Sequence, residues 1–71
     1  MPEFPLAALE RILKNQGASR VSRKACEEFS AILEEIATHL AKEADTLAQH
    51  AGRRTIIAED VRLAKKRGPG I

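Results

Sequence analysis

The 71-residue sequence is poor in the residues that hold most small domains together: it has one cysteine, two phenylalanines and no tryptophan or tyrosine. The single Cys26 excludes an intrachain disulfide and suits a reducing compartment. With only His39 and His50 beside it, the sequence has no zinc pattern, and we expect neither a metal nor a cofactor. A chain this short buries a small share of its surface, so a second chain is the expected source of additional core.

Long apolar runs are also absent. No stretch approaches the ~20 residues that a membrane span needs, and no signal-peptide pattern opens the chain. Alanine, leucine, isoleucine, glutamate, lysine and arginine dominate, as is typical of helices. We therefore expect an all-α, soluble, intracellular protein with no membrane contact, built as a single domain over residues 1–71.

The net charge is only +2, but the charge is unevenly distributed. Residues 1–24 hold five Lys and Arg against two Glu, a net charge of +3, and residues 53–71 hold six against two acids, a net charge of +4. Residues 25–52 hold one lysine against six acids, a net charge of −5. A fold that brings the two ends together would concentrate a basic surface.

The spacing of apolar residues predicts three helices separated by two short breaks. The first helix follows Pro5, a residue favoured where a helix opens, and Gly17 is well placed to end it. Ser22 is the expected N-cap of the second helix, which continues without glycine or proline to His50. Gly52 is its expected C-cap.

The segment Arg53–Ile56 is the second break and suits a short extended stretch. A third helix is expected over roughly Ile57 to Arg67. Its apolar stripe would bury Val61 and Ala64, with Leu63 to the side.

The second helix is too long for its own chain to cover. About 28 residues span roughly 42 Å, whereas a compact chain of this length has a radius of gyration of only about 11 Å. One apolar stripe follows the helix at steps of three and four residues: Cys26, Phe29, Ile32, Leu33, Ile36, Leu40, Ala44 and Leu47. An identical helix crossing it in antiparallel direction would cover this stripe. That crossing would also place the basic break before the helix in one chain beside the basic break after it in the other.

Three sequence runs carry a resemblance to a known family. They are Arg20-Val21-Ser22 after the first helix, His50-Ala51-Gly52-Arg53-Arg54-Thr55-Ile56 after the second, and Ala58-Glu59-Asp60-Val61 opening the third. With the short–long–short helix order, the whole chain resembles a tailless archaeal histone. The resemblance implies the histone fold, in which two chains form an intertwined antiparallel homodimer.

The resemblance also implies a function. Dimers would wrap and compact double-stranded DNA with little sequence preference, through backbone and minor-groove contacts, and would associate end to end into tetramers or longer fibres. The protein would be cytoplasmic and associated with the chromosome of an archaeal nucleoid. The alternative is a protein-interaction subunit that heterodimerises within a larger complex. An interaction-only protein need not keep Arg20, Arg53, Arg54 and Thr55 together.

Roles follow for the basic residues. Arg20 would enter the minor groove, held by Thr55 from the second chain, while Arg53 would pair with Asp60 of its own chain. Other basic residues would contact phosphates. Together the expected DNA-binding residues are Arg11, Lys14, Arg20, Arg23, Lys24, Arg53, Arg54 and Thr55. Arg23 and Lys24 stand where relatives often have acidic residues. Two cations there oppose the helix dipole, and a nearby phosphate would explain them.

Other residues are implied in assembly. The contact between dimers would be a four-helix bundle lined by Leu47, His50, Asp60 and Leu63. Gly17 stands where the family uses a small residue so that successive DNA turns stack closely. Ile57 stands where relatives often carry a lysine, which removes one possible phosphate contact, and Gln49 stands where an arginine is common.

Several points stay open at this stage. Lys65-Lys66-Arg67 is either a solvated helix end or an auxiliary DNA contact, and the chain pairs either with itself or with a paralogous histone. Cys26 falls on the apolar stripe and is expected in the core, and His39 is expected at a surface or interface. The sequence offers no nucleophile–base pair, no paired carboxylates in a cleft and no phosphate-binding glycine loop, so we expect no enzyme.

Overall fold

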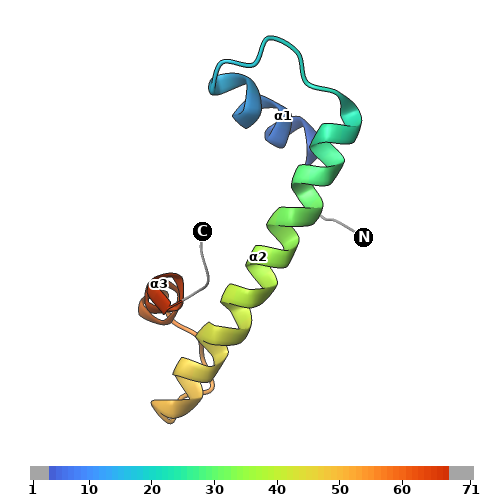
Figure 1. Ribbon diagram of the computed structural model, residues 1–71. Coiled ribbons are helices and arrows are strands. Elements are labelled where there is room, and N and C mark those ends of the chain that lie inside the picture. Colours follow the sequence, from blue (N-terminus) through green and yellow to red (C-terminus); the bar gives the residue numbers. More distant parts are fainter. Residues whose placement is uncertain (1–3, 68–71) are drawn as a thin grey trace. The chain divides into compact units, whose positions relative to one another are not determined.

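A computed structural model describes residues 4–67, which form three helices and no strand. Figure 1 shows α1 (Leu6–Asn15), α2 (Arg23–His50) and α3 (Ala58–Arg67), a short–long–short order. This order was predicted from the sequence, although α3 begins one residue later than expected. None of the helices over this range is long and apolar enough to cross a membrane.

Both ends of α2 are set by the residues predicted to set them. The Ala25 amide donates to Ser22 Oγ at 3.0 Å, which makes Ser22 the N-cap. At the other end Gly52 adopts φ +75°, its amide donates to the Gln49 carbonyl, and the Arg53 amide donates to the Ala48 carbonyl, both at 2.9 Å. These two hydrogen bonds form a Schellman motif, which turns the chain sharply out of the helix.

The chain divides into two compact units, and the division falls within α2, between Glu35 and Ile36. The N-terminal unit contains α1 and the first half of α2. The C-terminal unit contains the second half of α2 and α3. Each unit is described separately below.

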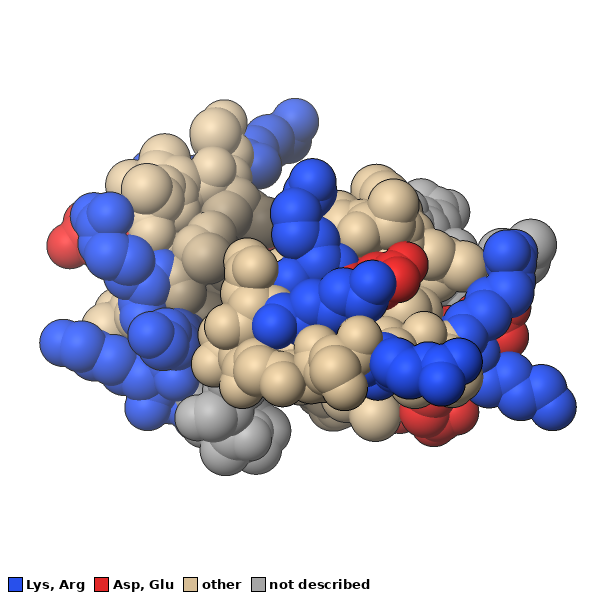
Figure 2. All heavy atoms as spheres, turned by 90° about the horizontal axis from the view of Figure 1, so that it is seen from above, with Lys and Arg blue, Asp and Glu red and all other residues tan. Residues whose placement is uncertain are grey.

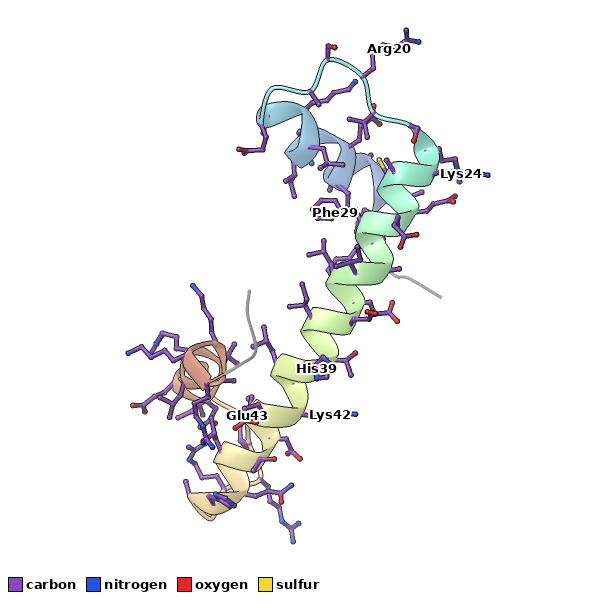
Figure 3. All side chains as sticks on the ribbon, in the orientation of Figure 1. Arg20, Lys24, Phe29, His39, Lys42 and Glu43 are labelled. Carbon is purple, nitrogen blue, oxygen red and sulfur yellow. The ribbon has the colours of Figure 1, made fainter. Side chains whose placement is uncertain are left out.

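The N-terminal unit has a thin core. Leu9 of α1 and Cys26 of α2 are each 3% exposed, and Phe29 is half-buried in the same unit (Figure 3). Ile32, which belongs to the apolar stripe predicted for the second helix, is 46% exposed, and Ile12 of α1 is 48% exposed. One chain therefore leaves apolar surface of both helices uncovered.

Ser30 is the most deeply buried polar residue of that unit. It has no exposed surface, and its hydroxyl makes no hydrogen bond within the described chain. A buried hydroxyl without a partner costs stability. Ser30 therefore lowers the stability of a unit whose core is already small.

The C-terminal unit is held by small side chains. Ala44 and Ala48 of α2 and Ala64 of α3 are each at most 1% exposed. The expectation that α3 buries Val61 was wrong for the single chain, because Val61 is 45% exposed. The helix instead turns Asp60 and Ala64 inward, which leaves Val61 about a quarter of a turn away from the buried side.

An open apolar groove lies beside Val61. It has a volume of about 320 Å³ and is lined by Ala37, Leu40, Ala41, Ala44, Ile56 and Val61. All six lining residues are aliphatic, so water in the groove meets no side-chain hydrogen-bonding group. Covering such a surface with apolar groups is favourable by about 25 cal/mol per Å².

Candidate nucleic-acid interface

The loop between α2 and α3 is fixed by an ion pair between Arg53 and Asp60. Arg53 Nη1 lies 2.8 Å from Asp60 Oδ2, and Arg53 Nη2 lies 2.9 Å from Asp60 Oδ1. Two parallel hydrogen bonds give this pair a defined geometry as well as charge attraction. The ion pair expected from the sequence is therefore present, and it connects the loop to the first turn of α3.

Asp60 has a second task that the sequence interpretation missed. Its Oδ2 accepts a hydrogen bond from the Ile57 amide at 2.9 Å, three residues earlier. An acidic side chain that reaches back to the N-cap amide forms one half of a capping box, and the spacing of three residues was the available signal. The Asp60 carboxylate thus caps the N-terminus of α3 and also holds the loop in place through Arg53.

These contacts favour the charged forms of both partners. The hydrogen bond from Arg53 and then the bond from the Ile57 amide lower the pKa of Asp60 from 3.8 to about 2, although its burial opposes them. The hydrogen bond to Asp60 raises the pKa of Arg53 above its usual value. The pair is therefore fully charged at neutral pH.

A pH dependence follows for the stability of this region. Because the pKa of Asp60 is lower in the folded chain, its stabilising effect is present above pH 3.8 and is lost as the pH falls towards about 2. We expect the free energy of unfolding of Asp60→Asn to be lower than that of wild type at pH 6. This difference should narrow as the pH falls from 3.8 to about 2. Chemical denaturation followed by circular dichroism from pH 2 to 6 measures it. A gap that stays constant over this range would contradict the assignment.

Arg54 and Thr55 occupy the same loop as exposed residues. The Thr55 carbonyl accepts a hydrogen bond from Arg53 Nη1 at 3.0 Å, so Arg53 braces the loop backbone as well as α3. The Thr55 hydroxyl and the Arg54 guanidinium make no hydrogen bond or ion pair to the described residues. Both side chains are thus available to a ligand.

Arg20 lies in the loop between α1 and α2, and its side chain extends into solvent (Figure 3). It has no ion-pair partner among residues 4–67. Lys24, in the first turn of α2, is also exposed and points away from the helix (Figure 3). Both cations are free to meet a phosphate.

The other predicted cations of the N-terminal unit differ in their surroundings. Lys14 pairs with Glu10 at 3.0 Å and Arg23 pairs with Glu27 at 3.2 Å, each one helical turn apart. Arg11 is exposed and has no such pair within the described range. Exposed pairs of this kind are worth little, so a phosphate could displace either carboxylate.

The residues predicted to join dimers do not share one environment. His50 is exposed, Leu63 is 43% exposed and Leu47 is half-buried, whereas Asp60 is only 4% exposed and directed into its own chain. Both oxygens of Asp60 are already bonded within the chain. In a contact between dimers, Asp60 would act by positioning the loop and α3.

Two further predicted positions can be located. Gly17 adopts φ +112°, a conformation that favours glycine, and a Cβ added there would meet nothing within 4 Å. Gln49 donates to Asp45 Oδ2 at 2.8 Å along α2, an interaction that the sequence interpretation did not foresee. His39 is exposed, as expected (Figure 3). Cys26 is buried, as expected.

Comparisons with known proteins agree with this arrangement. Residues 2–64 match the family of histone-like transcription factors (CBF/NF-Y) and archaeal histones. The chain is 47% identical over 66 residues to an archaeal histone HAN1 subunit from Thermococcus zilligii, covering 93% of this chain and 98% of that one.

Two other relatives are similar to the chain. It is 48% identical over 64 residues to probable archaeal histone 3 from Methanocaldococcus jannaschii, covering 90% and 96% of the two chains. It is 35% identical over 60 residues to histone H4 from Dictyostelium discoideum, covering 84% of this chain and 56% of the relative. The chain therefore belongs to the histone-fold family of histone-like transcription factors and archaeal histones.

Proposed function

We propose that this chain, a DNA-binding chromatin protein by its family, acts as a homodimer that wraps double-stranded DNA. The observation that carries this proposal is the loop after α2. Arg53 is held by Asp60 while Arg54 and Thr55 remain exposed without side-chain partners in the described chain. A braced loop with a free cation and a free hydroxyl is suited to phosphate oxygens.

Dimerisation is supported by the uncovered apolar surface. The groove beside Val61, together with the half-exposed Ile12 and Ile32, is what an identical chain would cover. In an antiparallel crossing of two α2 helices, Arg20 of one chain would approach Thr55 of the other. Each dimer would then offer two such basic loop pairs to the duplex.

The mode of binding follows from the chemistry of these groups. Lys and Arg side chains displace condensed counterions, and helix N-termini add amide donors to the same surface. Arg20 would enter the minor groove where it faces the protein. No described helix carries a set of Arg, Asn and Gln along one face for reading base edges. Recognition by shape and bendability, with little sequence preference, is therefore proposed.

Longer assemblies are proposed from exposed side chains at the end of α2 and on α3. His50 and Leu63 are accessible, and Leu47 is partly so. Contacts between dimers at this end would form tetramers or fibres along DNA, with Gly17 leaving room between successive turns. As a member of a DNA-packaging family, the chain has a chromosome-associated role. We place it in the cytoplasmic nucleoid of an archaeon and assign it a binding role without catalysis.

The proposal is tested by a mobility-shift titration on duplex DNA between 50 and 300 mM salt, paired with a nuclease footprint. We expect log affinity to fall linearly with log salt, by about 0.9 for each phosphate neutralised. We also expect protected lengths that grow in steps as protein is added. A flat salt response would contradict wrapping and would favour the alternative, a histone-fold subunit that pairs with a different chain.

A further inference from the structure

The outward side of α3 carries a second cluster of cations, which the proposed wrapping surface does not use. Arg62, Lys65 and Lys66 are exposed, and no ion pair engages them among residues 4–67. A group of Lys and Arg side chains lies over α3, at the left of Figure 2. We call these three residues the α3 basic face.

Helical geometry places this face opposite the buried side of α3. The side chains that α3 turns inward are Asp60 and Ala64. At 3.6 residues per turn, Arg62 points about 180° from the mean direction of these two, and Lys65 and Lys66 lie about 60° and about 40° from Arg62. The α3 basic face is therefore the part of the helix that projects furthest from its own chain.

The remaining sides of α3 have other occupants in the proposed assembly. Val61 lines the apolar groove that a second chain would cover. Leu63 lies on the opposite flank, where contact between dimers is proposed, about 100° from Arg62. Neither contact needs Arg62, Lys65 or Lys66, so the α3 basic face would stay open in the dimer and at the contact between dimers.

The charges around the face leave it strongly positive. Arg67, the next cation along, pairs with Glu43 of α2 at 3.5 Å. Glu59 is the carboxylate of α3 that lies nearest to this side, and it forms no ion pair with the three cations in the part of the chain that the structure describes. Around the helix Glu59 lies about 60° from Arg62 and about 20° from Lys66. The face therefore carries three unpaired cations against one carboxylate. Its net charge is opposite in sign to that of a duplex backbone, which carries one negative charge per ≈ 1.7 Å of its axis.

We propose that the α3 basic face binds the phosphate backbone of a second DNA segment, so that one dimer joins two duplexes. The inference rests on the proposed wrapping function, because the first duplex must already be held. The affinity of the α3 basic face for this second duplex is electrostatic and independent of the DNA sequence. A second duplex would be released at lower salt than the first, since fewer phosphates are neutralised.

The test is a capture assay with the full-length protein. A duplex fixed to beads is coated with protein, washed, and offered a second, protein-free fluorescent duplex. We expect the wild-type coating to capture it, with a salt slope of about 2 to 3 for each α3 basic face engaged. The triple variant Arg62→Gln, Lys65→Gln, Lys66→Gln should capture roughly tenfold less, while its affinity for the first duplex stays within about threefold.

A matched pair of single variants provides the control. Arg62→Gln and Lys42→Gln each remove one exposed cation, from α3 and from α2 respectively. Only Arg62→Gln should reduce capture. Circular dichroism melting should give unchanged midpoints for both variants, since neither side chain is buried.

Three results would overturn the proposal. Capture by the triple variant equal to wild type would show that another surface holds the second duplex. Loss of first-duplex affinity in parallel with capture would place the α3 basic face on the wrapped duplex itself. In a parallel arm the second duplex is also coated with protein. Capture in that arm alone would show that the α3 basic face binds an acidic surface of another copy and not DNA. Failure of wild type to bind the first duplex would instead refute the proposed function.

Discussion

Replacing Val61 with glutamate should leave the chain unable to form dimers and, as a consequence, unable to bind DNA. Val61 is 45% exposed in the single chain, where it lines the apolar groove with Leu40 and Ile56. A second chain seated in this groove would bury the introduced carboxylate without a partner, which costs several kcal/mol. Total stabilities of small proteins are only about 5–15 kcal/mol. We therefore expect a monomer with reduced helix content at micromolar concentration.

Sedimentation velocity and far-UV circular dichroism measure this result, and Ala58→Glu is the matched control. Ala58 is exposed and lies about one turn before Val61 on α3, but it does not line the groove, so the control adds the same charge beside the groove and not in it. A carboxylate in the first turn of a helix also suits the dipole. We expect the control to remain dimeric. A dimeric Val61→Glu variant with wild-type melting would show that this groove is not the dimer interface.

The helix boundaries were predictable because each depends on a few neighbouring residues. Ser22 caps α2 through an amide three residues away, and Gly52 ends α2 through hydrogen bonds to carbonyls of the last turn. Neither feature depends on the rest of the molecule. Pattern analysis of the sequence can find such local devices directly.

The burial of α3 was less predictable for a physical reason. Apolar spacing identifies the hydrophobic side of a helix but not the chain that covers it. In α3, the alanine and the charge-paired aspartate turn inward, and Val61 is left beside the groove. The buried carboxylate could be tolerated there because Arg53 and the Ile57 amide satisfy both oxygens.

The candidate site was predictable in composition and only partly in arrangement. The resemblance supplied the pairing of Arg53 with Asp60, which depends on residues seven apart in one loop and helix. It could not predict that Lys14 pairs with Glu10 and that Arg23 pairs with Glu27, because surface ion pairs depend on side-chain rotamers. Lys65 and Lys66 belong to the run Lys65-Lys66-Arg67 that the sequence analysis noted. That Arg62 joins them in the α3 basic face, while Arg67 pairs with Glu43, required the buried side of α3 to be known.

Arg20→Ala should produce the largest loss of DNA affinity that a single exposed substitution can cause in the proposed wrapping surface. The side chain lies in the loop before α2, extends into solvent and has no ion-pair partner among residues 4–67 (Figure 3). Each dimer would lose two cations from the minor groove. We expect the salt slope to fall by up to about 1.8, and affinity at moderate salt to fall roughly tenfold to a hundredfold on every duplex tested.

Lys42→Ala is the control, because it also removes two exposed cations per dimer, from the acidic middle of the sequence (Figure 3). Counterion release depends on cations that meet phosphates and not on the total charge of the protein, so the two variants should differ although their net charges are equal. Mobility-shift titrations on several duplexes, at four salt concentrations, separate the two effects. Equal losses of DNA affinity for both variants would show that Arg20 acts only through the net charge of the protein. A loss confined to one duplex would mean that Arg20 recognises bases and that binding is not governed by backbone shape.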